Sequence, residues 1–137
     1  MSFNLVTEAA ANVVLLVEDD TALRFELADL LRAEHLTVLE AANALEAMNL
    51  IREHDGLIDW LITDIQLGGI SGAHVAFEYR FQNPTRPIVF ITGYDEPPEL
   101  ARITGTILLR KPFTKEAFLE AIERVRQQEA GPGTLGL

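Results

Sequence analysis

The chain has 137 residues, of which 48% are hydrophobic and 23% charged, so it can form one domain with one core but not two ordinary ones. With 21 acidic and 11 basic residues its net charge is −10, which argues against direct nucleic-acid binding, since such binding needs a cationic surface. The absence of cysteine excludes disulfides, cysteine zinc sites and a thiol nucleophile.

Membrane and secretion signals are absent from the sequence. Residues 1–12 contain no Lys, no Arg and no long apolar run, so they do not form a signal peptide. No uninterrupted apolar stretch approaches the roughly 20 residues that a membrane-spanning helix needs. We therefore expect a soluble cytoplasmic protein that does not bind membranes.

Short apolar runs alternate with segments of helical period. Val13–Val17 is continuously apolar and rich in β-branched residues, as is typical of a strand buried on both faces. Similar runs follow at residues 36–39, 60–63, 88–92 and 107–109. These five runs predict five short strands.

The segments between the runs carry helix signals. Asn43, with Glu46 at capping-box spacing, and Ser71 are expected to cap two helices. Thr114 is expected to cap the last one. Apolar stripes mark the first and last helices, at Leu23, Leu27, Leu30 and Leu31 and at Phe118, Ala121, Ile122 and Val125. A short helix is expected between residues 92 and 105, bounded by Pro97-Pro98 and Gly105.

Strands that alternate with helices imply parallel strands joined by right-handed crossovers, and therefore a three-layer α/β domain with helices on both faces of an open sheet. We predict a flexible extension at residues 1–12, one folded domain at residues 13–128 and a flexible tail at residues 129–137.

Polar residues follow four of the five predicted strands. The first ends in Glu18-Asp19-Asp20, the third in Thr63-Asp64, the fourth in Thr92 and the fifth in Lys111. Ligands of parallel α/β sheets bind at the carboxyl edge, where these groups converge. Clustered carboxylates repel one another unless a hard cation such as Mg²⁺ lies between them. A carboxylate beside Mg²⁺ can accept a phosphoryl group as an aspartyl phosphate, while a lysine and a hydroxyl bind its oxygens.

Each of these residues also has a purely structural interpretation. The acidic triplet can cap the first helix, Asp64 can start the turn that leads to Gly68-Gly69, and Lys111 can be an ordinary surface lysine. It is their combination at one sheet edge that favours phosphoryl chemistry.

The motifs resemble the receiver domain of two-component response regulators over about residues 12–127. The matching pieces are VLLVEDD within 13–20, Asp59 through TDIQL at 63–67 with Gly72, PIVFITG at 87–93 and RKPF at 110–113. The resemblance implies a flavodoxin-like sheet of order 2-1-3-4-5, a stand-alone receiver, and a cis peptide bond between Lys111 and Pro112.

The resemblance also implies functional roles. Asp64 is the phosphoacceptor, Thr92 the switch hydroxyl and Lys111 the phosphoryl-binding amine. Mg²⁺ is the cofactor; it is bound by Asp19 and Asp64 directly, by Glu18 through water and by the backbone carbonyl of Gln66. The expected partners are a sensor histidine kinase or histidine phosphotransfer protein as donor and a downstream protein. Homodimerisation is expected through the family's fourth helix, fifth strand and fifth helix. Apart from catalysing its own phosphorylation and dephosphorylation, the protein is not expected to be an enzyme.

Three departures from the family pattern stand out. Gly68 replaces a common Pro, Leu108 replaces the usual aromatic residue of the switch, and the segment from Tyr94 to Thr106 is unusual. Residues 90–94 resemble stand-alone receivers that serve kinases of the HWE and related types. A bulky Tyr94 predicts slow loss of phosphate, because it hinders the attacking water.

Two other functions fit parts of the pattern. A pseudo-receiver that binds proteins without phosphorylation is favoured by Leu108 but disfavoured by the intact acidic pair, Asp64, Thr92 and Lys111. A dehalogenase-like phosphatase needs a second acid two residues after its nucleophile, where this chain has Gln66.

Overall fold

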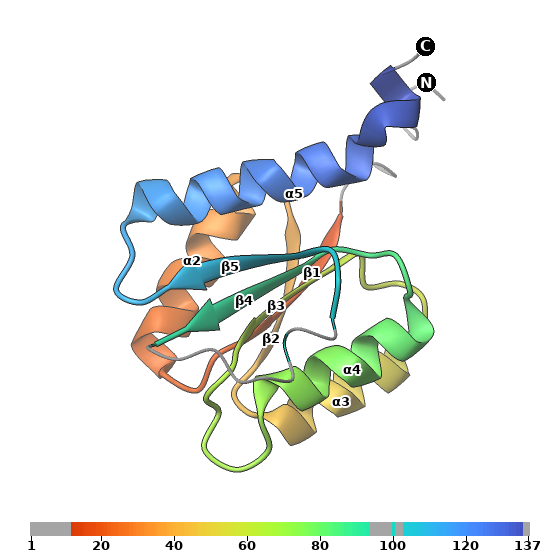
Figure 1. The fold of residues 1–137 in the computed structure, drawn as a ribbon. Coiled ribbons are helices and arrows are strands. Elements are labelled where there is room, and N and C mark those ends of the chain that lie inside the picture. The colour runs from red at the N-terminus through yellow and green to blue at the C-terminus, as the bar shows by residue number, and fades with distance from the viewer. Residues whose placement is uncertain (1–11, 94–99, 101–102, 136–137) are drawn as a thin grey trace, which may run out of the picture.

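The computed structural model of the protein describes residues 12–93, 100 and 103–135. The elements, with the labels of Figure 1, are β1 Val13–Val17, α2 Thr21–Ala33, β2 Thr37–Ala41, α3 Ala44–Glu53, β3 Trp60–Asp64, α4 Gly72–Gln82, β4 Ile88–Thr92, β5 Thr106–Arg110 and α5 Lys115–Leu135. No helix among these residues has the length and apolar character required to cross a bilayer.

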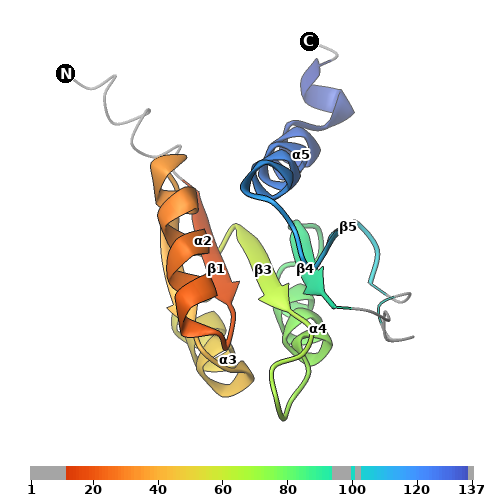
Figure 2. The same ribbon diagram turned by 90° about the vertical axis from the view of Figure 1, so that its left-hand side faces the viewer.

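The five strands form one parallel sheet of order β2-β1-β3-β4-β5, which confirms the predicted fold class. Helices α2 and α5 cover one face and α3 and α4 the other (Figure 1). Figure 2 shows β1, β3 and β4 running in the same direction, so their carboxyl ends meet at one edge. This edge is where the polar residues of the sequence motifs were expected to gather.

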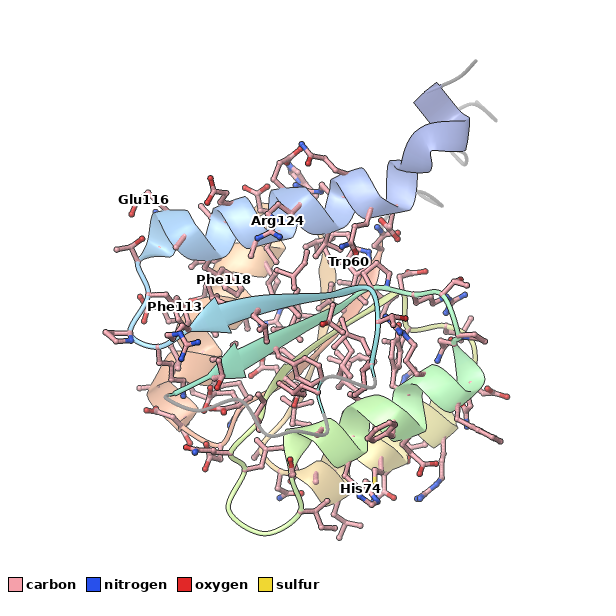
Figure 3. All side chains as sticks on the ribbon, in the orientation of Figure 1. Trp60, His74, Phe113, Glu116, Phe118 and Arg124 are labelled. Atoms are coloured by element: carbon pink, nitrogen blue, oxygen red, sulfur yellow. The ribbon has the colours of Figure 1, made fainter. Side chains whose placement is uncertain are left out.

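Strands β1 to β4 divide their side chains between two cores, whereas β5 contributes Ile107 and Leu109 to one of them only. Val14 and Leu16 of β1 pack with α2 and α5, whereas Leu15 and Val17 pack with α3 and α4. This alternation follows from the two-residue period of a strand, and it explains why strands covered on both faces are continuously apolar. In Figure 3, Trp60 and Phe118 lie between the sheet and α5.

The predicted helix caps are present. Asn43 accepts a hydrogen bond from the backbone N–H of Glu46, and Ser71 accepts one from Ala73. Thr114 accepts one from Ala117. The capping box is displaced by one residue, because the Glu46 carboxylate accepts from the N–H of Ala42 instead of that of Asn43.

Helix α2 ends in a Schellman motif, with bonds from the N–H of His35 to the carbonyl of Arg32 and from the N–H of Leu36 to the carbonyl of Leu31. His35 occupies the left-handed position with φ of 67°. Leu36 is therefore part of the helix cap, and β2 begins one residue later than predicted and reaches Ala41.

The last helix is longer than the sequence indicated. The backbone of α5 stays helical to Leu135, through the region in which a flexible tail was predicted from Glu129. Its distal part turns away from the axis of the rest in Figure 1. The predicted extension up to residue 11 lies outside the described residues, as do residues 94–99 and 101–102 of the segment in which a short helix was expected; Leu100 and Ile103 of that segment are buried.

Two arginines tie together connections at the amino edge of the sheet. Arg86 Nη1 donates to the carbonyls of Gly56 and Ile58, at 2.9 and 2.8 Å. Arg80 donates to the carbonyls of Arg86, Thr104 and Gly105. These two side chains thus join the three segments that lead into β3, β4 and β5.

Three phenylalanines are exposed in the part of the chain that the structure describes. Phe25 lies on the outer side of α2, and Phe77 and Phe81 lie on α4, where Phe81 is 87% exposed. Helix α4 is apolar on both sides, so its pattern alone does not distinguish the buried face.

Candidate functional site

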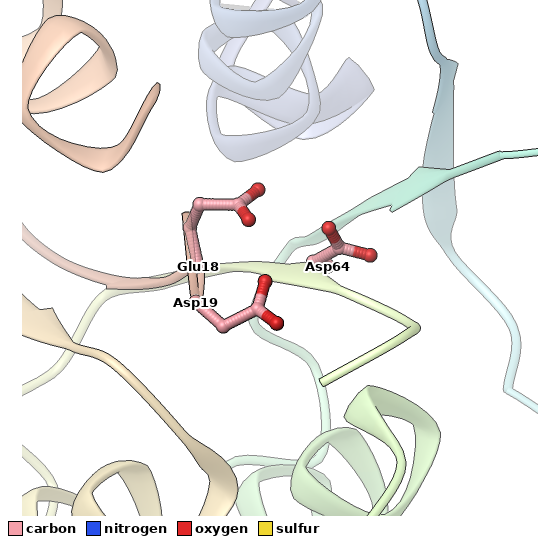
Figure 4. A group of neighbouring side chains, drawn as sticks. All are labelled: Glu18, Asp19 and Asp64. Carbon is pink, nitrogen blue, oxygen red and sulfur yellow. The ribbon is translucent and has the colours of Figure 1, made fainter. Parts of the chain in front are cut away.

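The carboxylates of Glu18, Asp19 and Asp64 converge at the carboxyl edge of the sheet. Glu18 and Asp19 follow β1 and Asp64 is the last residue of β3; one oxygen from each lies within 4.8 Å of the other two. Figure 4 shows the side chains of Glu18, Asp19 and Asp64 close to one another. The chain therefore brings together the three acids that the sequence predicted for a cation site.

Lys111 connects two of these acids. Its Nζ lies 2.6 Å from Asp64 Oδ2 and 3.4 Å from Glu18 Oε1. The second oxygen of Asp64 accepts a hydrogen bond of 2.9 Å from the backbone N–H of Gln66. Both oxygens of Asp64 are thus fixed, and a cation from β5 neutralises part of the acidic charge.

Glu18 is fully buried and incompletely hydrogen-bonded. Its Oε2 accepts from the backbone N–H of Asp20 at 3.0 Å, whereas its Oε1 makes no hydrogen bond and is approached by the Lys111 ammonium at 3.4 Å. One ammonium at this distance offsets only part of the cost of burying a carboxylate beside two other acids, so a divalent cation would stabilise the cluster further. The three acids supply oxygen ligands, which Mg²⁺ prefers. The site therefore fits a divalent cation, because it offers three carboxylate donors and a buried oxygen that makes no hydrogen bond.

Burial and charge shift the ionisation of this cluster. Burial raises the pKa of Glu18 to about 7, and the neighbouring charge of Asp64 and a hydrogen bond with Asp19 act in the same direction, against the Asp20 N–H and Lys111. Burial by itself would lower the pKa of Lys111, but the hydrogen bond and charge of Asp64, together with Glu18, outweigh it and raise that pKa.

Thr92 and the peptide bond after Lys111 complete the edge. Thr92 ends β4, is buried, and its carbonyl accepts a hydrogen bond of 2.7 Å from the Lys111 N–H. The Lys111-Pro112 bond is cis, as expected. Tyr94, which the sequence associated with phosphate lifetime, lies outside the described residues, and Leu108 is exposed on β5.

A cleft of about 520 Å³ adjoins Lys111. Among the described residues it is lined by Asp20, Leu23, Gly93, Lys111, Pro112 and Phe113. It lies between the start of α2 and the loops that follow β4 and β5, so it offers a ligand a route to the amine that contacts Asp64.

The three residues of the acidic triplet Glu18-Asp19-Asp20 do not all serve the same purpose. Asp20 caps α2, since its Oδ1 accepts from the N–H of Leu23 at 3.1 Å, whereas Glu18 and Asp19 join the acid cluster. The structural and functional interpretations of the triplet therefore hold for different residues.

Sequence reasoning missed Arg24, whose Nη1 donates to the carbonyl of Glu18 at 2.8 Å. Its position four residues after the last acid of the triplet was the only available signal. It also missed the close approach of Gly72 to the site: an added Cβ there would overlap the carbonyl oxygen of Asp64.

The fold and this edge place the chain among doubly wound α/β proteins that bind ligands at the carboxyl ends of their strands. Residues 14–123 match the family model of the response regulator receiver domain. The chain therefore belongs to the receiver domain family.

Curated relatives agree with this assignment. The chain is 31% identical over 127 residues to nodulation protein W of Bradyrhizobium diazoefficiens, covering 90% of this chain and 55% of that protein. It is 34% identical over 119 residues to the sensory transduction protein LytT of Oceanobacillus iheyensis, covering 83% and 48%. The sensor kinase CckA of Brucella abortus is 27% identical over 119 residues, 85% of this chain and 13% of that protein. The chain thus spans only part of each of these relatives.

Solved structures show the same fold. A response regulator receiver protein from Sinorhizobium medicae superposes with a TM-score of 0.77 at 26% identity, covering 87% of this chain and 97% of that one. The chemotaxis protein CheY4 of Vibrio cholerae superposes with a TM-score of 0.74 at 25% identity, covering 85% and 99%.

Proposed function

We propose that this chain acts in a phosphorelay by accepting a phosphoryl group on Asp64 from a phosphohistidine donor, with Mg²⁺ bound beside it. The observation that supports this most directly is the convergence of the carboxylates of Glu18, Asp19 and Asp64, with, among the described residues, only the Lys111 ammonium between two of them. Membership of the receiver family supports the same chemistry.

In the proposed step, an oxygen of Asp64 attacks the phosphorus, the bond from phosphorus to the donor imidazole nitrogen breaks, and its electron pair returns to the imidazole. The Lys111 amine moves from Asp64 Oδ2 to an oxygen of the phosphoryl group, and the Thr92 hydroxyl donates to another. A Mg²⁺ ion held by Glu18, Asp19, Asp64 and the carbonyl of Gln66 would neutralise negative charge on the transferred group. The cleft beside Lys111 would admit the donor imidazole.

The output of this reaction is a change in affinity for another protein. The donor in the proposal is a sensor histidine kinase or a histidine phosphotransfer protein, and the setting is the cytoplasm. Phosphorylation at Asp64 would alter the surface that includes β5 and α5, on which exposed Leu108 lies and through which two copies would associate. The chain would catalyse only its own phosphorylation and dephosphorylation.

The proposal is tested by incubating the protein with a small phosphodonor and measuring its intact mass. Wild type with Mg²⁺ should gain one phosphoryl group, whereas Asp64→Ala, or wild type with a chelator, should not. A wild-type chain that stays unmodified, or an Asp64→Ala chain that is modified equally, would refute it. An unmodified wild type would favour the pseudo-receiver, and steady hydrolysis of a small phosphate ester would favour the phosphatase.

A further inference from the structure

Arg24, on the first turns of α2, contacts the backbone that carries the candidate cation ligands. Its Nη1 donates a hydrogen bond of 2.8 Å to the carbonyl of Glu18. Its Nε lies 3.3 Å from Glu40 Oε1, on the neighbouring strand β2. The Arg24 side chain is only 12% exposed, so these contacts are made largely out of water.

The Glu18 carbonyl belongs to the peptide unit that joins Glu18 to Asp19. A peptide unit is planar, so holding its oxygen fixes the direction in which the backbone leaves β1 toward Asp19. The N–H of Glu18 is held separately, by the carbonyl of Ala41 at 3.0 Å. Arg24 therefore fixes the one side of Glu18 that the sheet does not.

Glu40 holds the guanidinium in place. Its Oε1 accepts from Arg24, while its Oε2 accepts from Arg32 Nη2 at 3.1 Å. Arg32 also donates to a backbone carbonyl, that of Val38, at 3.3 Å. Arg24 and Arg32 thus make the same two kinds of contact to Glu40 and to a carbonyl, but only Arg24 reaches the acidic edge.

We propose that Arg24, held by Glu40, is a positioning residue for the Mg²⁺ site: it orients the peptide between Glu18 and Asp19 so that both carboxylates face Asp64. This inference rests on the proposed function, because it assumes that the three acids bind Mg²⁺. Groups that orient metal ligands from behind typically change metal affinity by 10- to 100-fold when they are removed.

The test measures the Mg²⁺ dissociation constant by calorimetry for wild type, Arg24→Ala, Arg24→Lys, Glu40→Gln and Arg32→Ala, with urea unfolding in a chelator to confirm that each variant is folded. Arg24→Ala should weaken Mg²⁺ binding about tenfold. Arg24→Lys should fall between it and wild type, because one ammonium cannot reproduce the two-sided contact. Glu40→Gln should weaken binding less than Arg24→Ala. Arg32→Ala should stay within about twofold of wild type.

Phosphorylation by a small phosphodonor supplies a second readout. Arg24→Ala should need more Mg²⁺ for half-maximal rate but should approach the wild-type rate when Mg²⁺ saturates. Binding by Arg24→Ala within twofold of wild type, or an equal loss in Arg32→Ala, would overturn the positioning role. If Arg24→Ala does not fold, unchanged binding in both Arg24→Lys and Glu40→Gln would overturn it. Failure of wild type itself to bind Mg²⁺ would instead overturn the proposed function.

Discussion

Mg²⁺ binding should displace a proton from Glu18. The pKa of this carboxyl is raised to about 7 by burial and by its acidic neighbours, so at neutral pH the metal-free site holds a proton on roughly half of the molecules. A carboxyl binds a metal ion in its ionised form. At pH 8 about nine-tenths of the Glu18 side chains would be ionised and at pH 6 about one-tenth, so Mg²⁺ should bind about tenfold more weakly at pH 6.

Calorimetry can measure both the affinity and the proton. Titrations at pH 6, 7 and 8 in buffers of different ionisation enthalpy should give release of about half a proton at pH 7 and the tenfold change in affinity across the range. Glu18→Gln is the matched control, since it keeps the shape of the side chain and cannot ionise. It should bind Mg²⁺ more weakly, with little dependence on pH. A wild-type dissociation constant equal within twofold at pH 6 and pH 8 would refute the reasoning.

The same carboxyl should make the metal-free protein less stable as the pH rises. The folded state retains a proton on Glu18 from pH 4.5, the ordinary pKa, to about 7, whereas the unfolded state releases it, so the contribution of Glu18 to stability falls through this window. The full difference is on the order of 3 kcal/mol. Urea unfolding with a chelator should show Glu18→Gln gaining stability relative to wild type between pH 4 and pH 8, and a constant difference would contradict this.

Three further predictions concern stability, each measured by urea unfolding at fixed pH. Gly72→Ala should destabilise the protein by about 2 kcal/mol or more, because its Cβ would meet the carbonyl oxygen of Asp64. Gly69→Ala is the control: nothing lies within 4 Å of its added Cβ, so it should change stability by less than about 0.5 kcal/mol. Equal losses of stability in the two variants would contradict the steric argument. His35→Gly should stabilise by about 1 kcal/mol by relieving the positive φ, and any loss of stability would show that the imidazole contributes more than the backbone strain. Tyr79→Phe should destabilise by about 1 kcal/mol, since the phenol donates 2.8 Å to the carbonyl of Ile58, which keeps its second hydrogen bond from Arg86; an unchanged midpoint would mean that the Arg86 bond alone satisfies this carbonyl.

The sheet and the acidic edge could be predicted because both depend on order along the chain. Continuous apolar runs identify strands covered on both faces, and parallel strands bring the residues after them to one edge. That is why Asp64, the acid pair and Lys111 could be placed together without a structure. The helix caps were equally local, since each depends on residues two or three apart in sequence.

Other features depend on which segments meet in space. Apart from its position four residues after the acidic triplet, nothing in the local sequence distinguishes Arg24, which reaches the Glu18 carbonyl, from Arg32, which does not. The exposure of Phe81 depends on which side of an apolar helix faces the sheet. His35 in a left-handed conformation was also unpredictable, because Gly or Asn is the usual residue at that position of a helix end.

The hydrogen bonds of Arg80 and Arg86 hold the starts of β3, β4 and β5 together at the amino edge of the sheet. Arg86 joins the approach to β3 to the turn before β4, and Arg80 joins α4 to the residues just before β5. A shift of β4 or β5 at the opposite edge would then be a rotation about these anchored starts, and its amplitude would grow along each strand. The largest displacement would fall on Thr92 and Arg110, the last residues of the two strands. A small rotation of a strand about its start would therefore move the residues at the acidic edge more than any other part of that strand.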